Sequence, residues 1–139
     1  MPELSSLLHF YNQRKKEMNM NSLLVDLETL STIHHYLPSN ADLADMANFF
    51  SVFGDVTRLK MLSALSVEEL CVSDISTILD LNQTTVSHQL KILRDAGMVA
   101  FRREGKIIYY RIINKFVQEV MLMGASYICE ILTPRGKVG

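Results

Sequence analysis

Two short amphipathic segments joined by a tight turn constrain the fold of this chain more than any other feature. The first follows Ser73, a residue suited to cap a helix, and the second covers residues 83–96; in each, apolar residues recur at helical spacing. The turn between them ends in Asn82, which favours the N-cap of a helix, and Gly97 suits the left-handed residue that terminates one. The pattern predicts a helix-turn-helix.

The spacing of apolar residues changes from helical to extended after Met98. Residues 99–103 and 106–112 are rich in β-branched and aromatic residues, and they flank Glu104-Gly105. A glycine in a short polar turn between two such runs predicts a β-hairpin. A hairpin placed directly after a helix-turn-helix is a wing.

The segments on either side are expected to be helical. Residues 3–37 indicate one or two helices, and Ser39 or Asn40 is suited to cap the next helix. Asp55 is suited to cap a further one. Residues 116–131 predict a helix with so much apolar surface that we expect it to pack in a dimer, together with the N-terminal helices.

The expected fold class is mainly α with a small β-hairpin, a winged helix-turn-helix that dimerises through its N- and C-terminal helices. Residues 1–38 would form an N-terminal helical extension. Residues 39–133 would form the winged domain with its C-terminal dimerisation helix, and residues 134–139 a tail. A length of 139 residues and an apolar content of 48% suffice for one core.

The sequence favours a cytoplasmic protein with no membrane partner. No run approaches the roughly 18 apolar residues of a membrane-spanning helix, and the N-terminus lacks the pattern of a secretion signal. Cys71 and Cys129 are separated by 57 residues and do not form a disulfide framework. We expect both to be reduced thiols, with Cys129 in the core, and both stay open to metal or redox chemistry.

Charge is distributed unevenly along the chain. The formal net charge is only −1, which by itself argues against a nucleic-acid partner. Residues 82–115, however, carry seven basic and two acidic side chains, a net +5, while residues 22–80 carry two basic and nine acidic ones, a net −7. The basic island coincides with the second helix and the hairpin, which favours contact with a polyanion there.

One face of residues 83–96 is apolar, and the other carries hydrogen-bonding and cationic side chains. The candidate DNA contacts are Gln83, Thr84, Thr85, Ser87, His88, Lys91 and Arg94, with Arg102, Arg103 and Lys106 on the hairpin. Short polar side chains near a helix N-terminus can reach base edges, whereas Lys91 and Arg94 are better placed for phosphates. A polar helix face alone is equally explained by solvent exposure. Its position beside a basic hairpin favours double-stranded DNA.

Residues 50–112, about half of the chain, resemble the ArsR/SmtB family of metal-responsive repressors, and two blocks within them are specific to that family. They read TVSHQLKILRDAGMV at residues 85–99 and REGKIIYYRI at residues 103–112. The resemblance implies a homodimeric transcriptional repressor that occupies a palindromic operator and leaves it when an inducer binds, a metal ion being the favoured inducer. It also implies that the recognition positions are Gln83, Thr85, Ser87 and His88, with Arg103 and Lys106 in the wing.

The resemblance also places a metal site at residues 69–74, which read ELCVSD. Cys71 and Asp74 are retained, but a serine stands where sensors of soft ions usually carry a second cysteine. A single thiolate with a carboxylate and imidazoles suits zinc or a related divalent ion. In similar sensors the remaining ligands come from the N-terminal region of the partner subunit, which makes His34 and His35 the candidates here.

A second family site lies on the last helix. The corresponding residues here are Asn114, Phe116, Tyr127 and Glu130, of which only Glu130 could ligate a metal. We therefore expect this site to be absent and its positions to be used for packing.

Several alternatives stay open. Cys71 also suits a small buried residue at a helix entrance, and His34-His35 a solvated or packed helix end. Cys71 and Cys129 together would allow a repressor that responds to thiol oxidation or persulfidation. From another class, the chain could be a protein-interaction module that has lost DNA binding. An enzyme is not expected, because the sequence holds neither a triad-like serine nor a glycine-rich phosphate loop.

Overall fold

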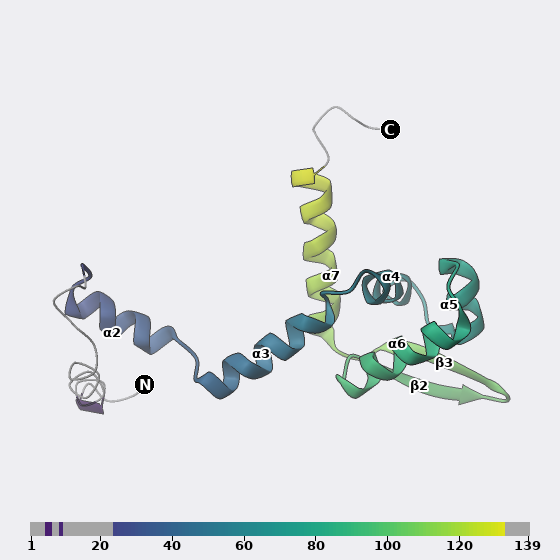
Figure 1. Cartoon of the computed structure of the whole chain (residues 1–139), viewed down its shortest axis with the longest axis horizontal. Coiled ribbons are helices and arrows are strands. Elements are labelled where there is room, and N and C mark those ends of the chain that lie inside the picture. The colour runs from purple at the N-terminus through teal and green to yellow at the C-terminus, as the bar shows by residue number, and fades with distance from the viewer. Residues whose placement is uncertain (1–4, 7–8, 10–23, 133–139) are drawn as a thin grey trace. The chain divides into compact units, whose positions relative to one another are not determined.

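The computed structural model describes residues 5–6, 9 and 24–132 of the chain (Figure 1). The chain divides into two compact units, residues 1–46 and 47–139. Most of the segment predicted to precede Pro38 as helix, and the predicted tail, lie outside the described residues. Among those that are described, no helix is both long and apolar enough to cross a lipid bilayer.

Polar side chains begin the two helices on either side of Pro38. α2 (Leu27–Tyr36) is capped by Asp26, whose Oδ1 accepts a hydrogen bond from an amide of the first turn. Before α3 (Asn40–Val52), the hydroxyl oxygen of Ser39 accepts a hydrogen bond from the Asp42 amide at 3.1 Å. Each cap satisfies an amide that the helix itself leaves unpaired. Of the two caps predicted for this helix, Ser39 makes the bond.

The remaining elements belong to the second unit. In chain order they are α4 (Val56–Leu65), β1 (Leu70–Cys71), α5 (Val72–Leu79), α6 (Gln83–Asp95), β2 (Val99–Glu104), β3 (Ile107–Ile112), α7 (Lys115–Tyr127) and a π-helical turn, Ile128–Leu132. Figure 1 shows α6 lying along the β2–β3 hairpin. The predicted helix-turn-helix is therefore α5 and α6, and the predicted wing is the hairpin that follows.

The core of the second unit takes apolar side chains from each of its α-helices. Those that are almost fully buried are Met61, Leu62, Ile75, Val86, Leu90, Leu93, Met98, Val99 and Val117. Burying a side chain of this size stabilises the fold by about 1.5–3 kcal/mol. Because three of these residues lie on α6, the core determines which side of that helix stays in contact with solvent.

The hairpin belongs to a three-stranded antiparallel sheet with strand order β1-β3-β2. The two long strands confirm the predicted hairpin, with Gly105 at φ +62° in the turn between them. β1 was not predicted, because two residues are too few to show an alternating pattern. Leu70 and Cys71 are extended because they pair with Tyr110 and Tyr109 of β3.

The ends of the two motif helices test the predicted caps. Asn82 caps α6 as predicted, and Gly97, at φ +72°, follows its C-terminus. The prediction for Ser73 is wrong: α5 begins at Val72, and Cys71 occupies the N-cap position without a side-chain hydrogen bond to the helix. The pairing of β1 with β3 places the extended residue at Cys71 and so starts the helix before Ser73.

α7 leaves much of its apolar surface uncovered. Val117 is buried in the core, whereas the exposed apolar side chains of α7 are Phe116, Leu122, Met123 and Tyr127, followed by Ile128 and Ile131 of the π-helical turn. Exposed apolar surface on one helix is typical of an interface with another protein chain.

Candidate nucleic-acid interface

The polar side chains predicted to contact DNA share the outer surface of α6. Its inner face is buried, while its exposed residues include all seven predicted contacts, Gln83, Thr84, Thr85, Ser87, His88, Lys91 and Arg94. Oδ1 of Asn82 accepts hydrogen bonds from the amides of Thr84 at 2.7 Å and Thr85 at 3.4 Å. This cap fixes the first turn, which carries the short polar side chains best suited to reach base edges.

A side chain from α4 holds α6 from behind. Arg58 donates from Nε to the Val52 carbonyl at 2.8 Å and from Nη1 to Oε1 of Gln89 at 3.2 Å. Through one half-buried guanidinium, Arg58 therefore connects α4 with the end of α3 and with α6. Neither Arg58 nor Gln89 was predicted from the sequence. The sequence does show Arg58 as the one arginine in an acidic segment, just after the helix cap Asp55. That pattern does not indicate which residue the arginine would bind.

The wing turns one of its faces toward α6. The guanidinium of Arg94 lies over the ring of Phe101, 5.4 Å from its centroid, and Phe101 pairs with Tyr110 across the hairpin. Side chains alternate along a strand, so Arg103 lies on the same face of β2 as Phe101. Lys106 stands in the two-residue turn, and both cations are exposed. α6 and this side of the wing thus present cationic groups next to each other.

Arg102 is placed differently from its neighbour Arg103. It forms ion pairs with Glu69 and, from Nη1, with Oε2 of Glu104 at 2.7 Å, and its guanidinium lies 4.7 Å from the ring centroid of Tyr109. Hydrogen bonding to Glu104, and then to Glu69, raises the pKa of Arg102 above its ordinary value. Two carboxylates therefore neutralise the positive charge of Arg102, which was predicted from the sequence to contact DNA.

A second predicted phosphate contact is also paired within the chain. Nζ of Lys91 lies 2.8 Å from Oδ2 of Asp95, one helical turn away, and both side chains are exposed. The hydrogen bond from Lys91 lowers the pKa of Asp95. An exposed pair of this kind contributes little to stability, so a phosphate could replace the carboxylate at small cost.

The predicted metal ligands fall in two places. Cys71 is half-buried at the N-cap of α5, with Sγ 3.8 Å from Oγ of Ser73, and Asp74 is exposed in the first turn of the same helix. His34 and His35 belong to the last turn of α2 in the first unit. Within the part of the chain that the structure describes, no three histidine, cysteine or acidic side chains gather as a metal site.

Comparisons with known proteins connect this arrangement to a family. A homodimeric winged helix-turn-helix DNA-binding domain from Mycobacterium bovis has a similar structure, with a TM-score of 0.62 and 31% identity, covering 70% of this chain and 93% of that one. Residues 55–100 match the model of the bacterial regulatory protein, arsR family. A transcriptional repressor SmtB homolog from Synechocystis sp. is 34% identical over 127 residues, which cover 91% of this chain and 96% of that protein. The chain belongs to the ArsR family. The cadmium resistance regulatory protein CadC of Listeria innocua is 38% identical over 95 residues, covering 68% of this chain and 80% of that protein.

Membership of the ArsR family confirms the fold and function expected from the sequence. The chain is a DNA-binding transcriptional repressor and not an enzyme, and its winged helix-turn-helix is the domain that binds DNA. The assignment of individual residues to bases, phosphates or an inducer stays a prediction.

The second family site has none of the expected ligand chemistry except Glu130. Asn114 caps α7 by accepting a hydrogen bond from the Phe116 amide at 2.9 Å. Phe116 and Tyr127 were predicted to serve in packing. In the single chain both are about half exposed, so neither is packed into its core. Cys129 is also exposed, which corrects the expectation that it lies in the core.

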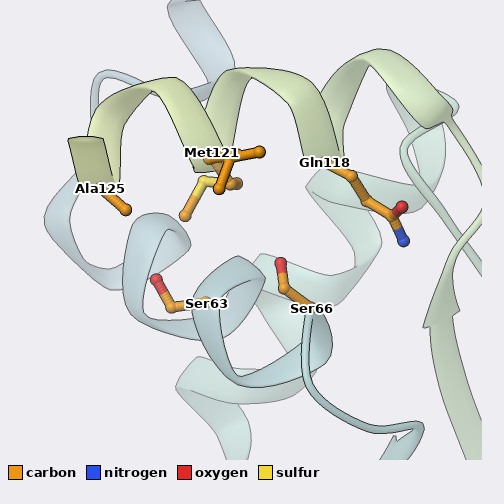
Figure 2. A pocket seen from close by; sticks show the side chains of 6 residues that line it. Ser63, Ser66, Gln118, Met121 and Ala125 are labelled. Carbon is orange, nitrogen blue, oxygen red and sulfur yellow. The ribbon is translucent and has the colours of Figure 1, made fainter. Parts of the chain in front are cut away.

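The ArsR-family chain also has a cavity of about 380 Å³ between α4 and α7 (Figure 2). Its lining residues are Ser63, Ser66, Gln118, Met121, Leu122 and Ala125. The hydroxyls of Ser63 and Ser66 donate to carbonyls of their own helix at 2.7 Å. Its lining includes no His, Cys, Asp or Glu side chain, so this cavity has none of the ligands proposed for the inducer site and no charged group.

Proposed function

We propose that this repressor acts as a homodimer on a palindromic operator and releases it when an inducer binds. Two recognition helices related by a two-fold axis match two inverted half-sites, which is why dimeric readers use palindromes. The apolar surface of α7 supports such a dimer, and the similar domain from Mycobacterium bovis is homodimeric. Burying that surface in a partner would remove it from water.

The observation that carries the DNA-reading role is the adjacency of α6 and the cationic side of the wing. Gln83, Thr84, Thr85, Ser87 and His88 would contact base edges, because they occupy the first turns of an exposed helix face. The phosphate contacts would come from Lys91, Arg94, Arg103 and Lys106. The partner is then double-stranded DNA, with specificity from the first group and much of the affinity from the second.

For the inducer we propose zinc or a related divalent ion held by Cys71 and Asp74. A thiolate and a carboxylate three residues apart lie at one end of α5, where both can face the same ion. Two ligands do not complete a four-coordinate shell, so His34 and His35 of the partner subunit would supply the rest. The relative from Listeria innocua is a cadmium resistance regulator, which supports a metal as the signal.

A thiol-responsive repressor is the second candidate. Cys71 and Cys129 are both free thiols, and the exposure of Cys129 makes it accessible to an oxidant or a persulfide donor. This candidate needs both cysteines, whereas the metal candidate needs only Cys71.

One experiment separates these candidates. Wild-type protein first selects a duplex from a random-sequence library, and its release from that duplex is then measured with zinc, cadmium, or a persulfide donor. Cys71→Ser should bind the duplex normally and lose release by zinc or cadmium, while Cys129→Ser should retain it. Loss of the response in both variants, with the persulfide donor as the active compound, would favour the thiol-responsive repressor. Failure to select any duplex would instead favour the interaction module that has lost DNA binding.

A further inference from the structure

Three side chains form a row across one face of the sheet. Cys71 in β1 pairs with Tyr109 in β3, and Tyr109 pairs with Arg102 in β2. Residues directly opposite each other in antiparallel strands point to the same side, so the row spans all three strands. Arg103 and the α6-facing residues of the hairpin lie on the other side.

The row is closed by Glu69, which immediately precedes β1. Its carboxylate pairs with the guanidinium of Arg102, which in turn lies over the ring of Tyr109. One arginine therefore connects the segment that leads into the helix-turn-helix with both strands of the wing. Its other partner, Glu104, is on the same strand and connects nothing new.

Glu69 depends on this arginine more than Glu104 does. The Glu69 side chain is 23% exposed and its Oε1 is buried, while the Glu104 side chain is 66% exposed. Among the described residues, Arg102 is the only cation that forms an ion pair with Glu69. A carboxylate with one oxygen shielded from water is disfavoured when it loses its cation, whereas an exposed carboxylate is simply hydrated.

This difference bears on the role of Arg102. A phosphate that took over the guanidinium of Arg102 would have to compete with Glu69, whose Oε1 is shielded from water, and with the Tyr109 ring. Arg103 differs in two ways: it takes part in none of the ion pairs among the described residues, and it lies on the face shared with Phe101 and α6. The same basic residue type thus has two different surroundings at adjacent positions.

We propose that Arg102 and Glu69 are positioning residues, which hold the wing at a fixed orientation relative to the helix-turn-helix so that Arg103 and Lys106 meet the DNA. The Arg102–Glu69 ion pair is then a structural link, called the strut below, and Arg102 does not contact a phosphate. The inference rests on the proposed role of the wing in DNA binding, and it replaces the assignment of Arg102 to the interface.

The sign of one affinity change tests the proposal. If Arg102 contacts DNA, Glu69→Gln removes a competing carboxylate and tightens binding. If Arg102 is a strut, Glu69→Gln weakens it, by about tenfold for a coupling of ordinary size. Glu104→Gln is the matched control, because it removes the same charge from the same arginine but leaves the strut intact, and its affinity should not fall. Binding is measured on the duplex selected by wild-type protein, well below the unfolding temperature of each variant.

Salt dependence and hydrogen exchange give independent readouts. Arg102→Gln should weaken binding with the salt slope unchanged, and adding it to Glu69→Gln should cost little more, since both break one strut. In the protein without DNA, the backbone amides of the β2–β3 hairpin should exchange hydrogen faster in Glu69→Gln than in Glu104→Gln. Tighter or unchanged binding by Glu69→Gln, or a slope reduced by about one in Arg102→Gln, overturns the proposal. If wild type selects no duplex, the proposed function fails, and the exchange comparison still decides whether the strut holds the wing.

Discussion

Arg58 on α4 donates a hydrogen bond from Nη1 to Oε1 of Gln89 on α6, over 3.2 Å, and the two residues are 31 positions apart in the sequence. The same guanidinium also binds the Val52 carbonyl at the end of α3. The recognition helix is therefore fixed by its apolar inner face and also by a polar bond behind it. A bond of this kind limits rotation of α6 about its own axis, which would misdirect every side chain on its outer face.

Replacing Gln89 by Ala should remove this bond without touching the outer face. The expected loss is about 1–2 kcal/mol in the free energy of unfolding, because the bond involves a charged donor that is half-buried. Specific DNA affinity should fall as well, measured on a selected duplex. Gln83→Ala is the control, since Gln83 is exposed at the start of α6 and should affect DNA affinity alone. Unchanged urea denaturation of Gln89→Ala would show that the bond contributes nothing.

Replacing Asn82 by Ala should loosen the first turn of α6. The side chain caps two amides, and loss of such a cap costs about 0.5–2 kcal/mol. Because that turn carries the proposed base contacts, specific affinity should fall more than affinity for unrelated DNA. Asn82→Ser keeps a capping oxygen and should restore most of both properties. Equal losses in Asn82→Ala and Asn82→Ser would mean that capping is not the cause. Thermal unfolding and titration of specific and random duplexes provide the two measurements.

Replacing Arg103 by Gln should remove one phosphate contact. The slope of log affinity against log salt should then decrease in magnitude by about 0.9, as expected for one fewer neutralised phosphate. Arg111→Gln makes the same change on β3, but Arg111 pairs with Ala100 and so lies on the opposite face of the hairpin. That control should leave the slope as it is in wild type. Identical slopes for all three proteins would contradict a role for the wing in phosphate binding.

The Lys91–Asp95 pair should respond both to pH and to mutation. Its lysine holds the pKa of Asp95 below the ordinary 3.8, so the pair is complete at neutral pH and is lost only as the pH falls through that lowered value. In Lys91→Gln, the carboxyl resonance of Asp95 should titrate at a higher pH than in wild type. Carbon-detected NMR titration makes the comparison.

The same pair predicts a gain in DNA binding. Asp95→Asn should free Lys91 for a phosphate and tighten binding to any duplex, whereas Asp95→Asn in a Lys91→Gln background should gain less. An equal gain in both backgrounds would show that only the overall charge changed. Filter binding at two salt concentrations is sufficient to distinguish these results.

Much of the local structure could be predicted because its causes lie within a few residues of each other. Helical spacing gave α5 and α6, the side chain of Asn82 caps the amides that follow it, and Gly105 allows the turn of the hairpin. The exposed polar face of α6 also followed, since the apolar positions identify its buried side. These features depend on local backbone preferences and on which side chains avoid water.

Tertiary structure alone decided what joins these elements. No local signal shows that Leu70 and Cys71 pair with β3, and that pairing is why α5 starts earlier than its predicted cap at Ser73. Sequence also treats Arg102 and Arg103 alike, as two cations on one strand. The alternation of the strand separates them, and only the packing of α6 on one face and of Glu69 near the other determines which arginine is neutralised and which stays available to DNA.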